Sequence, residues 1–205
     1  MNLDEIGQKF GTDKASDQNG FLEFYERFFS ERRFEELEIL EIGVLGGASL
    51  RTWEEYFPNS RISGLDISPD AKKEESTRIK IELLDQSSVG QLTSYAKKKK
   101  FDIIIDDGSH VWGHQIKTFR SFFPILNRTG LYIIEDLDTS YGKYFRDYSG
   151  DGTRTAASYL HEVSDWVVGH RQMSGDELND ESIALIYPTI DSVTYFRGTS
   201  VIRKK

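Results

Sequence analysis

The stretch "LEILEIGVLGGASLRTWEEYFPNSRISGLDI", residues 37–67, decides the fold. It begins with an apolar run of strand length at 37–43, followed by a glycine-rich turn. The amphipathic segment at 48–57 predicts a helix, and the apolar run at 61–67 predicts a second strand. A strand, a helix and a strand in this order are typical of a parallel sheet with helices on both faces.

The same alternation continues along the chain. Further strands are predicted at 79–85, 101–106 and 130–136, with helices at 87–100 and 112–126. The last part carries three short strand-like pieces without helices between them, at 183–188, 191–196 and 199–205. We expect these pieces to pair antiparallel at the edge of the sheet. The sequence therefore predicts an α/β fold of the Rossmann-like kind, mostly parallel with an antiparallel edge.

Length and composition limit the architecture. The 205 residues fit one domain, 1–205, with a helical region at 1–36 and a lid or substrate region at 137–180. Hydrophobic residues make up 38% and charged residues 29%, which is a globular balance. The lysine run at 96–100 is expected to end a helix, where cations suit the negative end of the helix dipole.

Charge and residue usage exclude several classes of function. The net charge of −8 argues against a nucleic-acid partner, because binding a polyanion requires neutralisation of its phosphates. The chain has no cysteine, which excludes disulfides and thiolate metal sites. It shows no apolar run of signal-peptide or membrane-spanning length, so we expect a cytoplasmic protein without a membrane partner.

A glycine turn and an acid indicate a nucleoside ligand. Gly43, Gly46 and Gly47 follow the strand at 37–43, and Asp66 closes the next strand. In such sheets ligands bind beyond the carboxyl ends of the strands, and an acid at this place accepts hydrogen bonds from ribose hydroxyls. Leu45 takes the place of the second glycine of the dinucleotide fingerprint, which weakens a nicotinamide cofactor. A plain strand-end cap remains the alternative for Asp66.

Acidic residues gather where two later strands end. "DDGSH" at 106–110 and "IIED" at 133–136 should meet at one edge, bringing together Asp106, Asp107, Glu135, Asp136 and His110. Ionised carboxylates this close repel one another unless a cation balances them, and hard oxygen ligands suit Mg²⁺, Mn²⁺ or Ca²⁺. A divalent ion lowers the pKa of a bound hydroxyl, and a neutral imidazole can take its proton. The pattern indicates either a metal site with its own general base or a solvated strand end with a helix cap.

These motifs resemble those of a known family. The spacing E-x-G-x-x-x-G resembles the first motif of class I S-adenosylmethionine-dependent methyltransferases. "DDGSH", "GLYIIEDLDTSY" and "GTDK" near the start are similar to the metal-dependent macrolide sugar O-methyltransferases of the mycinamicin and macrocin type. The resemblance implies a mostly parallel seven-stranded sheet, S-adenosylmethionine and Mg²⁺ as cofactors, a sugar or glycoside acceptor, a role in natural-product biosynthesis, and a homo-oligomer.

The resemblance also implies roles for single residues. The metal ligands would be Asp107, Glu135 and Asp136, and His110 would be the base that deprotonates the sugar hydroxyl. The residues on the cofactor side would be Glu41, Gly43, Gly47, Asp66, Asp85, Gln86 and Asp106.

Other interpretations stay open at this stage. Tyr141, Tyr144, Phe145 and Tyr148 can wall a sugar pocket or simply pack a lid, and Lys14 can meet the cofactor or form a surface ion pair. A catechol-type phenol O-methyltransferase would use the same metal chemistry. A Rossmann oxidoreductase and a non-catalytic nucleoside-binding module are the alternatives outside this class.

Overall fold

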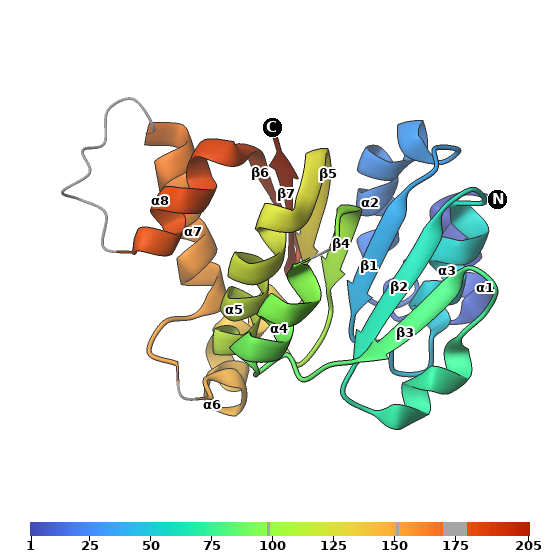
Figure 1. Ribbon diagram of the computed structural model, residues 1–205, viewed down its shortest axis with the longest axis horizontal. Coiled ribbons are helices and arrows are strands. Elements are labelled where there is room, and N and C mark those ends of the chain that lie inside the picture. Colours follow the sequence, from blue (N-terminus) through green and yellow to red (C-terminus); the bar gives the residue numbers. More distant parts are fainter. Residues whose placement is uncertain (98, 151, 170–179) are drawn as a thin grey trace. The chain divides into compact units, whose positions relative to one another are not determined.

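The computed structural model describes residues 1–97, 99–150, 152–169 and 180–205 (Figure 1). The chain divides into two compact units, Met1–Asp85 and Gln86–Lys205. Parts of two predicted segments lie outside the described residues. They are Lys98, at the predicted helix end, and 151 and 170–179, in the predicted lid region. The single-domain assignment of 1–205 stays a prediction.

The first unit is built around three parallel strands in the order β3-β2-β1. They are β1 (Glu38–Ile42), β2 (Arg61–Asp66) and β3 (Ile79–Leu83). Its helices are α1 (Leu3–Phe10), α2 (Phe21–Phe29) and α3 (Ala48–Tyr56), with 3-10 turns η1 (Ser30–Arg32) and η2 (Pro69–Glu74). Asn2 and Glu5 form a capping box that starts α1. Trp53 and Tyr56 of α3 are fully buried.

The second unit holds four strands in the order β4-β5-β7-β6. β4 (Phe101–Asp106) and β5 (Leu126–Ile134) run parallel, whereas β7 (Thr199–Lys204) pairs antiparallel with both β5 and β6 (Ile190–Phe196). The helices are α4 (Val89–Ala96), α5 (Trp112–Phe122), α6 (Phe145–Tyr148), α7 (Ala156–Gly169) and α8 (Glu181–Ile186). Short 3-10 turns lie at Phe123–Ile125 (η3), Leu137–Ser140 (η4), Gly142–Tyr144 (η5) and Tyr187–Thr189 (η7).

Two elements differ from the sequence prediction. The segment 183–188 was predicted as a strand, but it forms the end of α8 and the start of η7. The side chain of Asp180 caps this helix by accepting from the Ser182 backbone N–H, at 3.0 Å, so the apolar run starts with a helical turn. The strand predicted at 130–136 begins earlier, at Leu126, because the helix before it ends at Phe122 and passes through η3.

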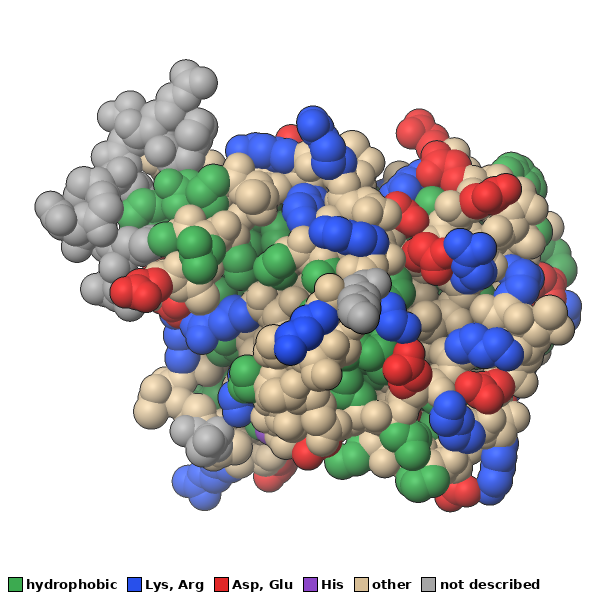
Figure 2. Space-filling model, viewed as in Figure 1, with side chains coloured by type: hydrophobic (Ala, Val, Ile, Leu, Met, Phe, Trp, Pro, Cys, Tyr) green, Lys and Arg blue, Asp and Glu red, His purple; other side chains and the backbone are tan. Residues whose placement is uncertain are grey.

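The number and direction of the strands confirm the predicted fold class. The described residues contain seven strands, of which β1 to β5 pair in parallel within their units and β6 and β7 form the antiparallel edge. Acidic and basic side chains are interspersed on the face that Figure 2 shows. In the described part of the chain, no helix is apolar and long enough to cross a membrane.

Candidate active site

The glycine turn of the first unit has a backbone that needs glycine at two positions. Gly43 has φ of 90° and Gly47 has φ of 69°, and α3 starts directly after Gly47. A Cβ on Gly47 would also lie 2.8 Å from the side chain of Glu74. Leu45, in the same turn, has φ of 47° and is 94% exposed. The turn is therefore a tight loop with a left-handed backbone at Gly43, Leu45 and Gly47, and its Leu45 side chain is exposed.

Asp66 binds the backbone of this turn. Its Oδ2 accepts from the N–H groups of Val44, at 2.8 Å, and Leu45, at 3.1 Å. Its Oδ1 accepts from Ser68 N–H at 2.8 Å. The cap interpretation thus describes what Asp66 does in this structure. Because carboxylate oxygens have two lone pairs each, this half-buried side chain can still accept from a ribose, and that role stays a prediction.

Glu41 and Lys14 form a buried pair in the first unit. Lys14 Nζ lies 3.6 Å from Glu41 Oε1, and Trp53 Nε1 donates to Glu41 Oε2 at 2.7 Å. Lys14 is only 1% exposed and Glu41 is fully buried. The surface ion pair considered for Lys14 is therefore wrong, since the pair is internal. Breaking a buried pair by removing one partner is costly, which ties the start of the chain to β1.

Three apolar side chains lie exposed beyond the carboxyl ends of the first unit's strands. Leu45 follows β1, Ile67 follows β2 and is 71% exposed, and Leu83 ends β3 and is 49% exposed. Sequence reasoning did not single out Ile67 and Leu83 as site residues. The available signal was an apolar residue placed at or just past a strand end. These side chains offer a surface for a flat ligand at that edge. Asp85, two residues after β3, is half-buried.

Gln86 braces the loop that follows β4. Its Nε2 donates to Asp106 Oδ1 at 2.7 Å, and its Oε1 accepts from Ser109 N–H at 2.9 Å. Asp106 is fully buried, and this burial raises its pKa to about 7. Tyr132 Oη also lies 3.4 Å from Asp106 Oδ2. Both residues were predicted on the cofactor side, and in this structure their polar atoms shape the loop that carries Asp107 and His110.

Three side chains of the second unit converge beyond β4 and β5. His110 Nε2 lies 3.3 Å from Asp136 Oδ2 and 4.0 Å from Asp107 Oδ1. One potential ligand atom from each of the three lies within 4.8 Å of the others, and all three side chains are half-buried. The predicted meeting of "DDGSH" and "IIED" thus occurs, since β4 and β5 end side by side and Glu135 N–H donates to Asp106 O at 3.0 Å. Two carboxylates and an imidazole form a donor set that suits a divalent ion.

Two members of this cluster have unusual backbones. His110 has φ of 57° and Asp136 has φ of 54°, which places both in the left-handed region. Histidine and aspartate tolerate this region better than most residues, yet the conformation still costs free energy. Such a conformation persists when the surroundings hold it, and it is common at functional sites.

Two neighbouring acids take other positions. Glu135, a predicted metal ligand, is buried, and its carbonyl accepts from Gln115 Nε2 at 2.8 Å. It does not belong to the group of three found among the described residues, so its ligand role stays a prediction. Asp138 is exposed and does not belong to the group of three either.

The segment that follows β5 places one aromatic ring against His110 and carries further exposed rings. The Tyr148 ring meets the His110 ring edge-on, with centroids 6.1 Å apart, and Tyr144 packs edge-on against Tyr148. Phe145 packs against Trp112, with ring centroids 4.6 Å apart. Tyr141, Tyr144 and Phe145 keep 54%, 37% and 49% of their surface exposed. Exposed rings beside a polar cluster suit stacking on a sugar, as the pocket-wall alternative requires.

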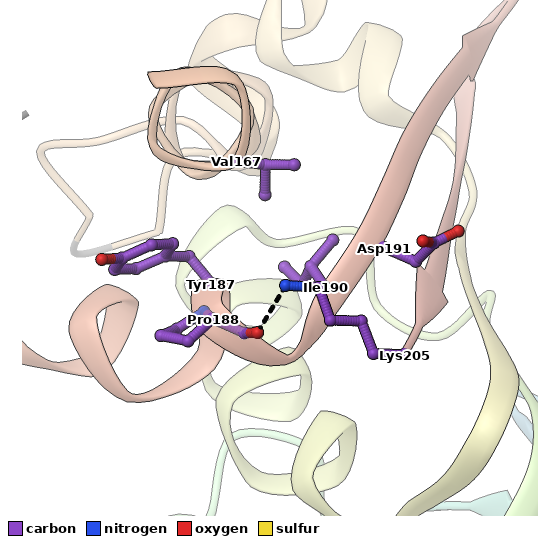
Figure 3. A pocket seen from close by; sticks show the side chains of 6 residues that line it. All are labelled: Val167, Tyr187, Pro188, Ile190, Asp191 and Lys205. Atoms are coloured by element: carbon purple, nitrogen blue, oxygen red, sulfur yellow. Dashed lines mark hydrogen bonds between the residues drawn. The ribbon is translucent and has the colours of Figure 1, made fainter. Parts of the chain in front are cut away.

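A separate cavity lies elsewhere in the second unit. Its volume is about 260 Å³, and Figure 3 shows its lining and the bond from Lys205 Nζ to Pro188 O, at 2.8 Å. The lining residues are Val167, Tyr187, Pro188, Ile190, Asp191 and Lys205. None of them belongs to the Asp107, His110 and Asp136 cluster, so this cavity is not the predicted site.

Comparison with known proteins identifies sugar-modifying relatives. The chain matches no protein-family model. It is 40% identical over 159 residues to demethylmacrocin O-methyltransferase of Streptomyces fradiae, covering 74% of this chain and 40% of that protein. It is 38% identical to a rhamnosyl tetracenomycin-C 3'-O-methyltransferase of Streptomyces olivaceus, covering 99% of this chain and 54% of that protein. With mycinamicin VI 2''-O-methyltransferase of Micromonospora griseorubida the identity is 37%, over 85% and 46% of the two chains.

Solved structures agree with these sequences. The MycE methyltransferase of the mycinamycin pathway, crystallised with Mg and SAH, has a TM-score of 0.88 and 28% identity. The match covers all of this chain and 53% of that one. The chain spans about half the length of the relatives and of the solved structure that it matches. By sequence and by fold, the chain is thus related to the S-adenosylmethionine-dependent sugar O-methyltransferases of natural-product biosynthesis, as its motifs indicated.

Proposed function

We propose that the chain is an S-adenosylmethionine- and divalent-metal-dependent O-methyltransferase that acts on a hydroxyl of a sugar or glycosylated natural product. The observation that carries the proposal is the convergence of Asp107, His110 and Asp136 within 4.8 Å. Support comes from relatives named as O-methyltransferases, one of them of a rhamnosyl tetracenomycin, and from the Mg and SAH of the MycE crystals.

The donor set fits a hard divalent ion. We assign Asp107 and Asp136 as ligands, with Glu135 as the third predicted ligand, and Mg²⁺ as the ion. Two half-buried carboxylates near each other are stabilised by a cation that offsets their repulsion. Such an ion would supply one thing to the chemistry, a lowered pKa for a bound sugar hydroxyl.

His110 is assigned as the base. Its Nε2 already points at the two carboxylates, so a hydroxyl held beside them would be within its reach. Nε2 takes the hydroxyl proton, the oxygen forms a bond to the methyl carbon, and the carbon–sulfur bond breaks. The sulfonium charge is neutralised as S-adenosylhomocysteine leaves. The exposed rings of Tyr141, Tyr144 and Phe145 would contact the acceptor.

The residues on the cofactor side are assigned one by one, each from its own surroundings or from the family motif. In the first unit, the positive φ of Gly43 and Gly47 allows the tight turn that the family motif places beside the cofactor, and Asp66 would accept from the ribose. The remaining assignments, carried over from the family motif, are Glu41, Asp85, Gln86 and Asp106.

A methylation assay with the full chain tests the proposal. The chain would be incubated with S-adenosylmethionine and Mg²⁺ against a sugar nucleotide, a glycoside and a catechol, and product mass would be recorded with and without EDTA. We expect a mass gain of one methyl group on a sugar-bearing acceptor, lost with EDTA and restored by Mg²⁺. Methylation of the catechol alone would favour the phenol enzyme. Methylation that persists after full chelation would contradict the metal assignment, and binding of S-adenosylhomocysteine without any turnover would favour a binding module.

A further inference from the structure

The strained backbones of His110 and Asp136 have a shared neighbour. The two residues lie on different loops, after β4 and after β5, and both have φ between 54° and 57°. In these conformations the two side chains come within 3.3 Å of one another. Whatever holds the two peptide groups therefore also sets the distance between the imidazole and the carboxylate.

Thr139 contacts both peptide groups. Its Oγ1 donates to the carbonyl oxygen of Asp136 at 2.7 Å, and the carbonyl oxygen of His110 lies 3.5 Å from the same hydroxyl. The Thr139 backbone N–H also donates to Asp136 O, at 3.2 Å. One hydroxyl proton thus has a strong acceptor on one loop and a weaker one on the other, which is a three-centre arrangement.

Thr139 is itself fixed in place. It is only 5% exposed, and its carbonyl accepts from Trp112 Nε1 at 3.2 Å. Trp112 starts α5, two residues after His110, and is buried. The threonine is therefore anchored to the element that follows one loop while its hydroxyl binds the carbonyl of the other.

We infer that Thr139 is a positioning residue, which holds Asp136, an assigned ligand of the divalent ion, at its present distance from the assigned base His110. The inference rests on the proposed function. Hydrogen-bond partners behind the ligands of a metal orient those ligands, and their loss typically weakens metal affinity or activity by about ten- to a hundredfold. Thr139 does this through backbone carbonyls rather than through the ligand side chains.

Removing the hydroxyl at constant shape tests the inference. We expect Thr139→Val to weaken Mg²⁺ binding about tenfold, measured by calorimetry, and to lower kcat by a similar factor with little change in KM for S-adenosylmethionine. Thr139→Ser keeps the hydroxyl, so both quantities should stay within about threefold of the unmodified chain. Mn²⁺ binding followed by electron paramagnetic resonance gives a second readout that does not depend on turnover.

A matched control separates positioning from general packing. Thr118 is also fully buried in the second unit, and its Oγ1 donates to His114 O at 2.9 Å, away from the three-residue cluster. Thr118→Val should leave Mg²⁺ affinity unchanged. Equal Mg²⁺ affinities in Thr139→Val, Thr139→Ser and Thr118→Val would overturn the inference while leaving the proposed function intact.

Two further outcomes are decisive. If the unmodified chain binds no Mg²⁺, the proposed function fails and the inference fails with it. If Thr139→Val does not fold, Thr139→Ala is compared with Thr139→Ser by the same Mg²⁺ titration, and equal affinities again overturn the inference.

Discussion

Aspartates at strand ends serve different purposes in the two units. In the first unit, Asp66 ends β2 and its carboxylate accepts from three backbone N–H groups. In the second, Asp107 and Asp136 follow β4 and β5 and face the imidazole of His110. The residue type is the same, and each aspartate lies at the end of a strand or within two residues of it. Their partners differ, since Asp66 binds backbone N–H groups whereas Asp107 and Asp136 lie beside an imidazole.

The largest effect should follow from removing an acid of the second unit. We expect Asp107→Ala to abolish Mg²⁺ binding and to lower turnover about a thousandfold, because a metal ion contributes several kcal/mol to stabilising charge in the transition state. Calorimetry with Mg²⁺ and the methylation assay measure the two effects. Asp138→Ala, an exposed neighbour on the second loop, is the control and should leave both unchanged. Unchanged Mg²⁺ binding in Asp107→Ala would contradict the assignment of Asp107 as a metal ligand.

Replacing the imidazole should have the next largest effect. His110→Asn keeps a residue that tolerates positive φ but removes the base, and we expect a rate of methyl transfer about a hundredfold lower. Affinity for S-adenosylhomocysteine should be unchanged, since His110 is not among the residues assigned to the cofactor. Single-turnover kinetics measure the rate, and His161→Ala, an exposed histidine of α7, is the control. An unchanged rate in His110→Asn would exclude it as the base.

Removing the Asp66 side chain should lower stability and cofactor affinity but not Mg²⁺ affinity. Asp66→Ala leaves three backbone N–H groups without their acceptor, so we expect a loss of about 1–3 kcal/mol in the free energy of unfolding. S-adenosylhomocysteine should bind about tenfold more weakly, as expected for one lost hydrogen-bonding group. Mg²⁺ affinity should not change, and a fall in Mg²⁺ affinity would contradict the division of roles. The control is Asp70→Ala, which removes an exposed carboxylate that pairs with Lys73 and should cost little.

The sequence predicted the strands better than the loops. A continuous apolar run bounded by polar residues marked 101–106, and β4 has those same bounds. Glycines with positive φ explain why Gly43 and Gly47 stood out in the motif. The run at 183–188 was misassigned because a short apolar segment fits a strand and a helix equally, and only the cap at Asp180 distinguishes them.

The sequence predicted which residues form the site, but not the backbone conformations and buried contacts around them. The pairing of β4 with β5 brings Asp107 and Asp136 together, and the order of elements was enough to expect that. The positive φ of His110 and Asp136 could not be predicted from the sequence, because histidine and aspartate also occur widely with negative φ. Burial of Lys14 depends on Glu41, far along the chain, so no local signal distinguishes it from a surface lysine.

The smallest predicted effect concerns a second aspartate that binds backbone. Asp180 accepts from Ser182 N–H, as Asp66 accepts from Ser68 N–H, and it also pairs with Arg120 and Arg154. Burial acts to raise the pKa of Asp180, but the bonds from Ser182 and the two guanidinium charges outweigh it and leave the pKa below the ordinary 3.8. A lowered folded-state pKa means that the ionised form stabilises the fold above pH 3.8, and that this contribution fades as the pH falls further.

Two variants separate the charge of Asp180 from its cap. Asp180→Asn keeps an oxygen that can cap α8 and should cost up to about 1 kcal/mol at neutral pH, a cost that shrinks below pH 3.8. Asp180→Ala removes cap and charge, so it should cost about 1 kcal/mol more, and that extra cost should persist in acid. Urea unfolding at neutral and acidic pH measures both. If both variants lost the same free energy of unfolding at every pH, the bond from Ser182 N–H to the Asp180 oxygen would contribute nothing to stability. Asp180 would then resemble Asp66 in geometry but not in its effect on the fold.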